Sequence, residues 1–114
     1  PMTVISIANA PHYRWGEVCD GWHLVREADL SVIQERVPPG AGEVRHRHRR
    51  ARQFFYVLTG AAELEVEGVV HRLTPGEGLA VAPGDAHRLS NPGPAALTFL
   101  VTSTPPSHGD RETL

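Results

Sequence analysis

The 114-residue sequence contains no lysine, and all eleven of its basic residues are arginines. Without lysine, a Schiff-base mechanism and a lysine-based phosphate loop are both excluded. The single cysteine, Cys19, has no partner within the chain for a disulfide. No apolar run approaches the roughly 20 residues that a membrane-spanning helix needs. These absences predict a protein without internal disulfides and without a membrane partner.

Charge patterning points to the same kind of protein. The formal net charge is −2 with histidine neutral, and the opening residues lack the charged and apolar regions of a secretory signal, so we expect a cytoplasmic location. Five arginines lie between Arg45 and Arg52, a density found in nucleic-acid-binding surfaces. However, only alternate side chains of a strand share a face, and Glu63, Glu65 and Glu67 can offset the charge. We predict a solvated or dimer-rim face and no nucleic-acid partner.

Turn-forming residues are spread along the whole chain. Eleven glycines and ten prolines account for 21 of the 114 residues, and they separate short segments of strand length. No segment of ten or more residues has apolar positions at helical spacing. The sequence therefore predicts one all-β domain over residues 1–114, a sandwich or barrel with almost no helix. The predicted strands are 30–37, 43–48, 54–59, 61–67, 69–73, 79–82, 87–91 and 96–102.

The two ends of the chain are expected to differ from this pattern. Residues 1–21 hold Tyr13, Trp15 and Cys19 among polar residues, which favours an irregular or edge segment that packs its aromatic rings onto the barrel. Residues 105–114 form a polar tail that we expect to be ordered only by docking. Within this tail, His108 could fold over the mouth of the barrel.

Most of the candidate metal-ligating residues lie between Gly40 and Gly60. His46 and His48 are two residues apart on a predicted strand, so their imidazoles share one face, together with Val44. We assign Glu43, Arg45 and Arg47 to the opposite face. Two inward imidazoles with Cα atoms roughly 6.5 Å apart can converge on one metal ion. Two further candidates are the amide oxygen of Gln53 and the ring of His87, which follows a tight turn at 83–86.

These residues also match a known pattern. The order Gly40, His46, His48, Gln53 and Gly60 resembles the first motif of the cupin superfamily, and residues 76–91, with Gly76, Pro83, Gly84, His87 and Asn91, resemble the second. The resemblance implies a double-stranded β-helix, or jelly-roll barrel, that is often a homodimer. It also implies a divalent metal ion held by His46, His48, Gln53 and His87.

Two positions depart from the cupin pattern. The family usually has Pro where this chain has Ala82, a minor change because Pro83 can still stiffen the turn. It usually has Glu where this chain has Gln53. A neutral amide leaves the metal with its full +2 charge, which favours an anionic substrate and raises any redox potential. It also removes a candidate general base. Gln53 could instead orient a water or the substrate, and the whole site could be vestigial.

The resemblance favours a metal-dependent enzyme acting on a small enol, diol or keto acid, most of all a dioxygenase similar to the quercetinase-like cupins. A sugar or keto-acid isomerase and a non-catalytic binding module are the alternatives. The metal would be Fe, Mn, Ni, Cu or Zn, and no catalytic residue or organic cofactor site is assigned. We expect a dry wall of Phe55, Val57, Leu64, Val66, Leu89 and Phe99, with Trp22, His23 and Gln34 as further candidate lining residues.

Overall fold

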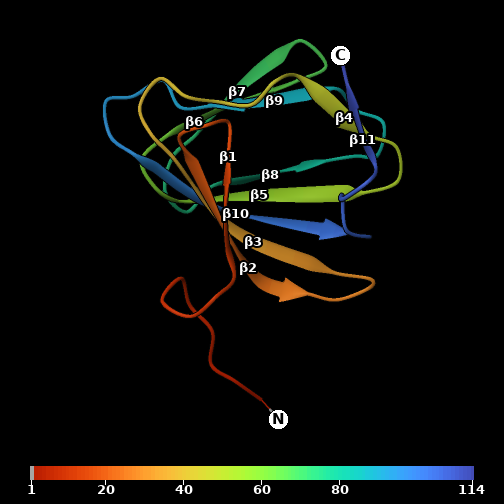
Figure 1. The fold of residues 1–114 in the computed structure, drawn as a ribbon. Coiled ribbons are helices and arrows are strands. Elements are labelled where there is room, and N and C mark those ends of the chain that lie inside the picture. Colours follow the sequence, from red (N-terminus) through yellow and green to blue (C-terminus); the bar gives the residue numbers. More distant parts are fainter. Residues whose placement is uncertain (1) are drawn as a thin grey trace.

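Eleven β-strands in two antiparallel sheets make up the computed structural model, which describes residues 2–114 (Figure 1). Pro1 lies outside the described residues. The strands are β1 His12–Trp15, β2 Cys19–Arg26, β3 Ser31–Val37, β4 His46–His48, β5 Arg52–Thr59, β6 Ala62–Val66, β7 Val69–Leu73, β8 Gly78–Val81, β9 His87–Ser90, β10 Leu97–Thr104 and β11 Arg111–Thr113.

The two sheets form the layers of a jelly roll. One sheet has the strand order β1-β2-β3-β10-β5-β8, and the other has the order β11-β4-β9-β6-β7. In Figure 1 the second sheet lies above the first, with β11 running beside β4, while the chain before β1 extends away from both layers. The all-β prediction is confirmed, and none of residues 2–114 is helical. Consequently the described chain has no helix with the length and hydropathy needed to cross a membrane.

Alternation along the strands places the core between the two sheets. Phe55 and Val57 of β5 are buried, whereas Phe54, Tyr56 and Leu58 point outward and remain exposed. Strands of the facing sheet contribute the opposite side of the same cluster. Its largest fully buried apolar members are Phe99, Leu64, Leu89, Leu97, Val37, Val57 and Val81. The core therefore fills one part of the space between the layers, and polar residues occupy the other part.

Two turns explain why the chain reverses where it does. Glu67 and Gly68 both have positive φ, 49° and 86°, as a two-residue hairpin turn between β6 and β7 requires. Gly60 has φ 78°, and a Cβ atom at this position would come within 2.4 Å of the Ala96 carbonyl oxygen. Only glycine fits there, because both the backbone conformation and the close approach exclude a side chain.

Three of the strands are not among the eight predicted from the sequence. Tyr13 and Trp15 lie on β1, which forms an edge of the larger sheet, and Cys19 begins β2. Of the two alternatives that the sequence left open for residues 1–21, residues 12–21 fit the edge segment, because β1 and β2 form a hairpin that adds to β3 at the edge of the sheet. The third strand, β11, lies in the polar tail and pairs with β4. Its three residues carry no apolar alternation that would reveal a strand.

Candidate metal centre and its cavity

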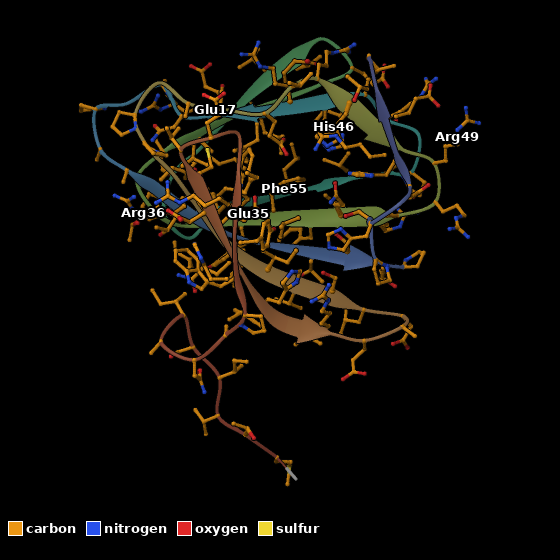
Figure 2. All side chains as sticks on the ribbon, viewed as in Figure 1. Glu17, Glu35, Arg36, His46, Arg49 and Phe55 are labelled. Carbon is orange, nitrogen blue, oxygen red and sulfur yellow. The ribbon has the colours of Figure 1, made fainter. Side chains whose placement is uncertain are left out.

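Three histidine rings meet on the inner face of the smaller sheet. His46 and His48 are alternate residues of β4, and His87 is the direct cross-strand partner of His46 on β9, so all three rings project to the same side. The ring centroids lie 5.0 Å apart for His46 and His48, and 4.5 Å apart for His46 and His87. One ligating atom from each ring lies within 4.8 Å of the others, so the cluster could hold a metal ion. Figure 2 shows His46 between the layers.

Hydrogen bonds at the back of the rings orient them. The Nδ1 atom of His46 lies 2.8 Å from the Val44 carbonyl oxygen, and that of His87 lies 2.9 Å from the Asp85 carbonyl oxygen. A ring that donates from Nδ1 leaves the Nε2 lone pair free. Nε2 of His87 and Nδ1 of His48 are buried without a hydrogen-bond partner among the described residues. Unpaired buried nitrogens are costly unless something binds them, so they fit a metal ion.

Burial also keeps these rings neutral. It lowers the pKa of His46 to about 4, since a charged ring is poorly solvated there and the hydrogen bond to Val44 compensates only in part. Burial likewise lowers the pKa values of His48 and His87, in each case as the main cause. Metal ligation requires an unprotonated imidazole nitrogen. Near neutral pH the three rings are therefore in the form that can bind a metal ion.

Gln53 enters the same cavity from β5 of the opposite sheet. Its Nε2 donates to Ser103 Oγ over 3.1 Å, which fixes the amide so that Oε1 is the remaining polar atom. This oxygen is buried and has no hydrogen-bond partner in the part of the chain described. The amide thus offers an oxygen to the cavity, as expected either for a metal ligand or for a group that orients a water or substrate.

Two carboxyl groups share the cavity with His46 and His48, that of the buried Glu35 and that of the largely buried Glu43. Glu43 Oε2 is 3.9 Å from His46 Nε2, while Glu43 Oε1 accepts the Leu89 N–H at 2.9 Å. Glu35 accepts a hydrogen bond from the Tyr13 hydroxyl at 3.0 Å. Burial, then the nearby Glu43 charge, raises the pKa of Glu35 to about 8. Burial raises the pKa of Glu43 to about 7, opposed by its hydrogen bond from Leu89.

The position of Glu43 corrects the sequence-based assignment. Strict alternation places Glu43 outside and Val44 inside, but Val44 is 59% exposed and Glu43 faces the cavity. The reason is that β4 begins only at His46. In the irregular backbone before it, the Glu43 N–H donates to the Leu89 carbonyl and the Glu43 side chain turns toward β9. Arg45 and Arg47 do point outward, where they pair with Glu65 and Glu112.

The polar tail closes one side of the cavity. Ser107, His108, Gly109 and Arg111 all line it, so His108 lies where the sequence suggested. The tail is held by Asp110, whose carboxylate accepts the backbone N–H groups of residues 49, 50 and 51 at 3.2, 2.9 and 2.9 Å. Because these bonds join the tail to the turn after β4, the end of the chain becomes part of the site wall.

The cavity has a volume of about 260 Å³ and draws on both sheets. Of the six residues expected to form a dry wall, only Phe55 lines it, and the other five lie in or against the packed core. Trp22, His23 and Gln34 are likewise absent from the described lining. The lining residues are Tyr13, Trp15, Ile33, Glu35, Glu43, His46, His48, Gln53, Phe55, Val101, Ser103, Ser107, His108, Gly109 and Arg111.

Several of these residues are missed by the sequence reasoning. Glu35 had a visible signal, since it occupies the inward phase of β3 between Ile33 and Val37. Tyr13 and Trp15 are also two residues apart, the spacing of side chains on one face of a strand. Arg111 had no signal, because its strand pairs with β4 more than 60 residues earlier in the chain.

Comparison with known proteins agrees with this architecture. The sequence matches the cupin domain family over residues 33–103. An uncharacterized protein of Methanocaldococcus jannaschii is 28% identical over 93 residues, which cover 81% of this chain and 74% of that protein.

Solved structures show the same fold. A sugar phosphate isomerase of Silicibacter pomeroyi superposes with a TM-score of 0.79 and 24% identity, covering 90% of this chain and 75% of the other. KdgF from a Halomonas species gives a TM-score of 0.83 and 22% identity, with coverage of 91% and 95%. At such identities the likeness shows the fold alone.

Proposed function

Because this chain belongs to the cupin family, we propose that it is a metal-dependent enzyme that moves a proton on a small hydroxy-carbonyl or keto-acid substrate, as an isomerase does. One observation carries the proposal. A single cavity of about 260 Å³ is lined both by two of the clustered histidines, His46 and His48, and by the carboxyl groups of Glu35 and Glu43. Metal ligands alone would serve many reactions, whereas isomerisation also needs groups that accept and return a proton.

His46, His48 and His87 would hold the ion, and Gln53 Oε1 would provide a neutral oxygen. A divalent ion bound there supplies Lewis acidity toward a substrate oxygen. The neutral imidazoles and the amide of Gln53 leave the charge of such an ion uncompensated. The remaining side chains then decide which chemistry follows.

The carboxyl groups supply the proton handling in this proposal. Glu43 Oε2 lies beside the histidine cluster, 3.9 Å from His46 Nε2, so it is the group that would accept a proton from a substrate held at the histidines. Its other oxygen is fixed by the Leu89 N–H, which limits its movement. Glu35, held by the Tyr13 hydroxyl, provides a second proton reservoir within the same cavity. Phe55, Ile33 and Val101 contribute apolar surface that excludes water.

A dioxygenase is the second candidate. The neutral ligand set around Gln53 favours it, since a metal that keeps its +2 charge has a raised redox potential and prefers an anionic enol. The two candidates differ in a simple way. Proton transfer proceeds without oxygen and with redox-inert zinc, whereas a dioxygenase consumes oxygen and needs a redox-active metal.

The test is deuterium exchange without oxygen. Zinc-loaded protein is incubated in D₂O with 2-oxopentanoate or dihydroxyacetone phosphate, and exchange at the carbon next to the carbonyl is followed by NMR. We expect exchange above the protein-free rate and a loss of about 100-fold or more in Glu43→Gln. His71→Ala, on β7 away from the cavity, is the matched control. Oxygen consumption by iron-loaded protein, without anaerobic exchange, would support the dioxygenase instead. If neither activity is detected, the result would support a non-catalytic binding module.

Homodimerisation is still a prediction, and the structure offers a candidate surface for it. Phe54, Tyr56 and Leu58 project from β5 on the side away from the cavity and are 45%, 37% and 36% exposed. Apolar side chains gathered on one sheet face are typical of an interface between copies. Sedimentation of the wild type and of Phe54→Glu tests this, with a dimer-to-monomer shift expected only in the variant.

A further inference from the structure

The C-terminal strand places Arg111 at the wall of the cavity, while the residue as a whole remains exposed. Arg111 is the cross-strand partner of His48, and Glu112 is the partner of Arg47. Since paired residues of neighbouring strands project to the same side, Arg111 shares the inner face with His48, while Glu112 shares the outer face with Arg47. The contacts agree with this assignment, because Arg111 lines the cavity and Glu112 pairs with Arg47 outside it.

Arg111 lacks, among the described residues, the carboxylate partner that three arginines in and beside β4 have. Arg45 is paired with Glu65, and Arg47 and Arg49 share Glu112. Among residues 2–114, no carboxylate oxygen lies within 4.0 Å of the Arg111 guanidinium. The backbone that carries Arg111 is nevertheless well held, through the Asp110 carboxylate and the pairing of β11 with β4. An unpaired guanidinium on a fixed strand is a preorganised anion receptor.

The positive charge of Arg111 influences the titratable groups of the whole site. Burial is the main cause of every pKa shift in the cavity, and the charge of Arg111 additionally lowers the pKa values of Glu35, Glu43, His46, His48 and His87. Glu35 is held mainly in its neutral form near pH 7, because its pKa is about 8. The guanidinium is therefore a positive charge without an ion-pair partner among the described residues, at the edge of a cavity in which Glu35 is mainly neutral near pH 7 and Glu43, with a pKa of about 7, is partly ionised.

We propose that Arg111 binds an anionic group of the substrate, a carboxylate or a phosphate, with His108 beside it on the same tail segment. This inference rests on the proposed function and narrows the substrate to an acid or a phosphoester whose reacting carbonyl faces the histidines. The tail thereby contributes to substrate specificity. Asp110 and Glu112 hold it in place, and Arg111 selects for a negatively charged ligand.

The test compares charged and neutral forms of one ligand in metal-free protein. The pairs are 2-oxopentanoate with its methyl ester, and dihydroxyacetone phosphate with dihydroxyacetone. Binding is followed by calorimetry and by tryptophan fluorescence, to which both Trp15 in the cavity lining and Trp22 contribute. In the wild type we expect at least one charged probe to bind more tightly than its neutral form. Arg111→Gln should abolish this preference, a loss of about 10- to 100-fold for the charged probe.

Two control variants separate the guanidinium from charge in general. Arg36→Gln removes an exposed arginine from the outer face of β3 (Figure 2) and should leave the preference unchanged. Arg111→Lys should restore part of it, because lysine keeps the charge but loses the planar fork. The pair with the larger preference identifies carboxylate or phosphate as the anion.

Several outcomes would overturn the assignment of Arg111. These are no preference for either charged probe in the wild type, an undiminished preference in Arg111→Gln, and an equal loss in Arg36→Gln. Thermal unfolding of each variant verifies that the barrel is intact. Since the measurement uses metal-free protein, a failure to bind zinc would count against the proposed function while leaving the Arg111 result readable.

Discussion

Two groups of residues can be compared at this site: the histidine wall, which is the cluster of His46 and His48 on β4 with His87 on β9, and the carboxyl wall, formed by Glu35 and Glu43. Both are largely buried, but they differ in the hydrogen bonding of their polar atoms. Within residues 2–114, His48 and His87 each keep a buried nitrogen without a hydrogen-bond partner, whereas Glu35 and Glu43 each accept a hydrogen bond. Burial lowers the pKa of His46 and raises that of Glu35. Burial thus favours the neutral form on both walls, but only the histidine wall keeps buried nitrogens without a partner among the described residues.

The largest expected effect concerns the histidine wall. The double variant His46→Ala, His87→Ala removes two of the three clustered rings and should weaken zinc binding by about 1,000-fold or more, since ligands act together on one ion. Competition with a chromogenic chelator measures the affinity. His71→Ala, a histidine of β7 outside the cluster, should bind zinc like the wild type. Equal zinc content in the double variant and the wild type would remove the metal site from this cavity.

The carboxyl wall predicts a loss of stability at alkaline pH. The pKa of Glu35 is raised from 4.5 to about 8 in the folded state, so folding binds a proton between these values. Stability from the neutral carboxyl is complete below pH 4.5 and is lost as pH rises through about 8. Relative to Glu35→Gln, the wild type should lose on the order of 4 kcal/mol between pH 4.5 and pH 9.

Urea unfolding at the two pH values measures this difference. Gln keeps the shape of the side chain and its ability to accept from the Tyr13 hydroxyl, so the variant isolates the titration. Parallel stability curves for the two proteins would show that Glu35 does not carry a raised pKa.

The histidine wall predicts the opposite slope on the acid side. The pKa of His46 falls from 6.5 to about 4 on folding, so the unfolded chain binds more protons between these values. Metal-free protein should therefore lose about 2 kcal/mol from this residue as pH falls from 6.5 to 4. Guanidinium unfolding of the wild type and His46→Asn across this range checks the sign. A difference that does not change with pH would contradict the buried neutral ring.

The smallest expected effect tests the residue that joins the two walls. Gln53→Glu introduces a carboxylate where the amide oxygen faces the cavity, and it should tighten zinc binding by about 10-fold if that oxygen is a ligand. It should also move the pH dependence of binding, because the new group must lose its proton. Gln34→Glu, on the outward phase of β3, is the matched control. No change in affinity or pH profile would assign Gln53 to orienting a water or substrate.

Local pattern was enough to locate the histidine wall. His46 and His48 lie two apart before a turn-bounded strand, and His87 follows a tight turn, so alternation alone places them inward. The carboxyl wall was harder to foresee. Glu43 lies before β4 begins, where alternation no longer applies. Glu35 occupies an inward position of β3 between two apolar residues, so the alternation pattern alone does not mark it as a site residue.

By itself the sequence determined that the chain forms short strands, which of their faces are apolar, and that three histidines project inward, because period-two alternation and turn residues act over a few neighbours. Only the tertiary structure decided what surrounds those histidines. The pairing of β11 with β4 and the hairpin of β1 with β2 bring Arg111 and Tyr13 to the cavity. Such contacts depend on which distant strands share hydrogen bonds, and that choice is made by the packing of the whole barrel.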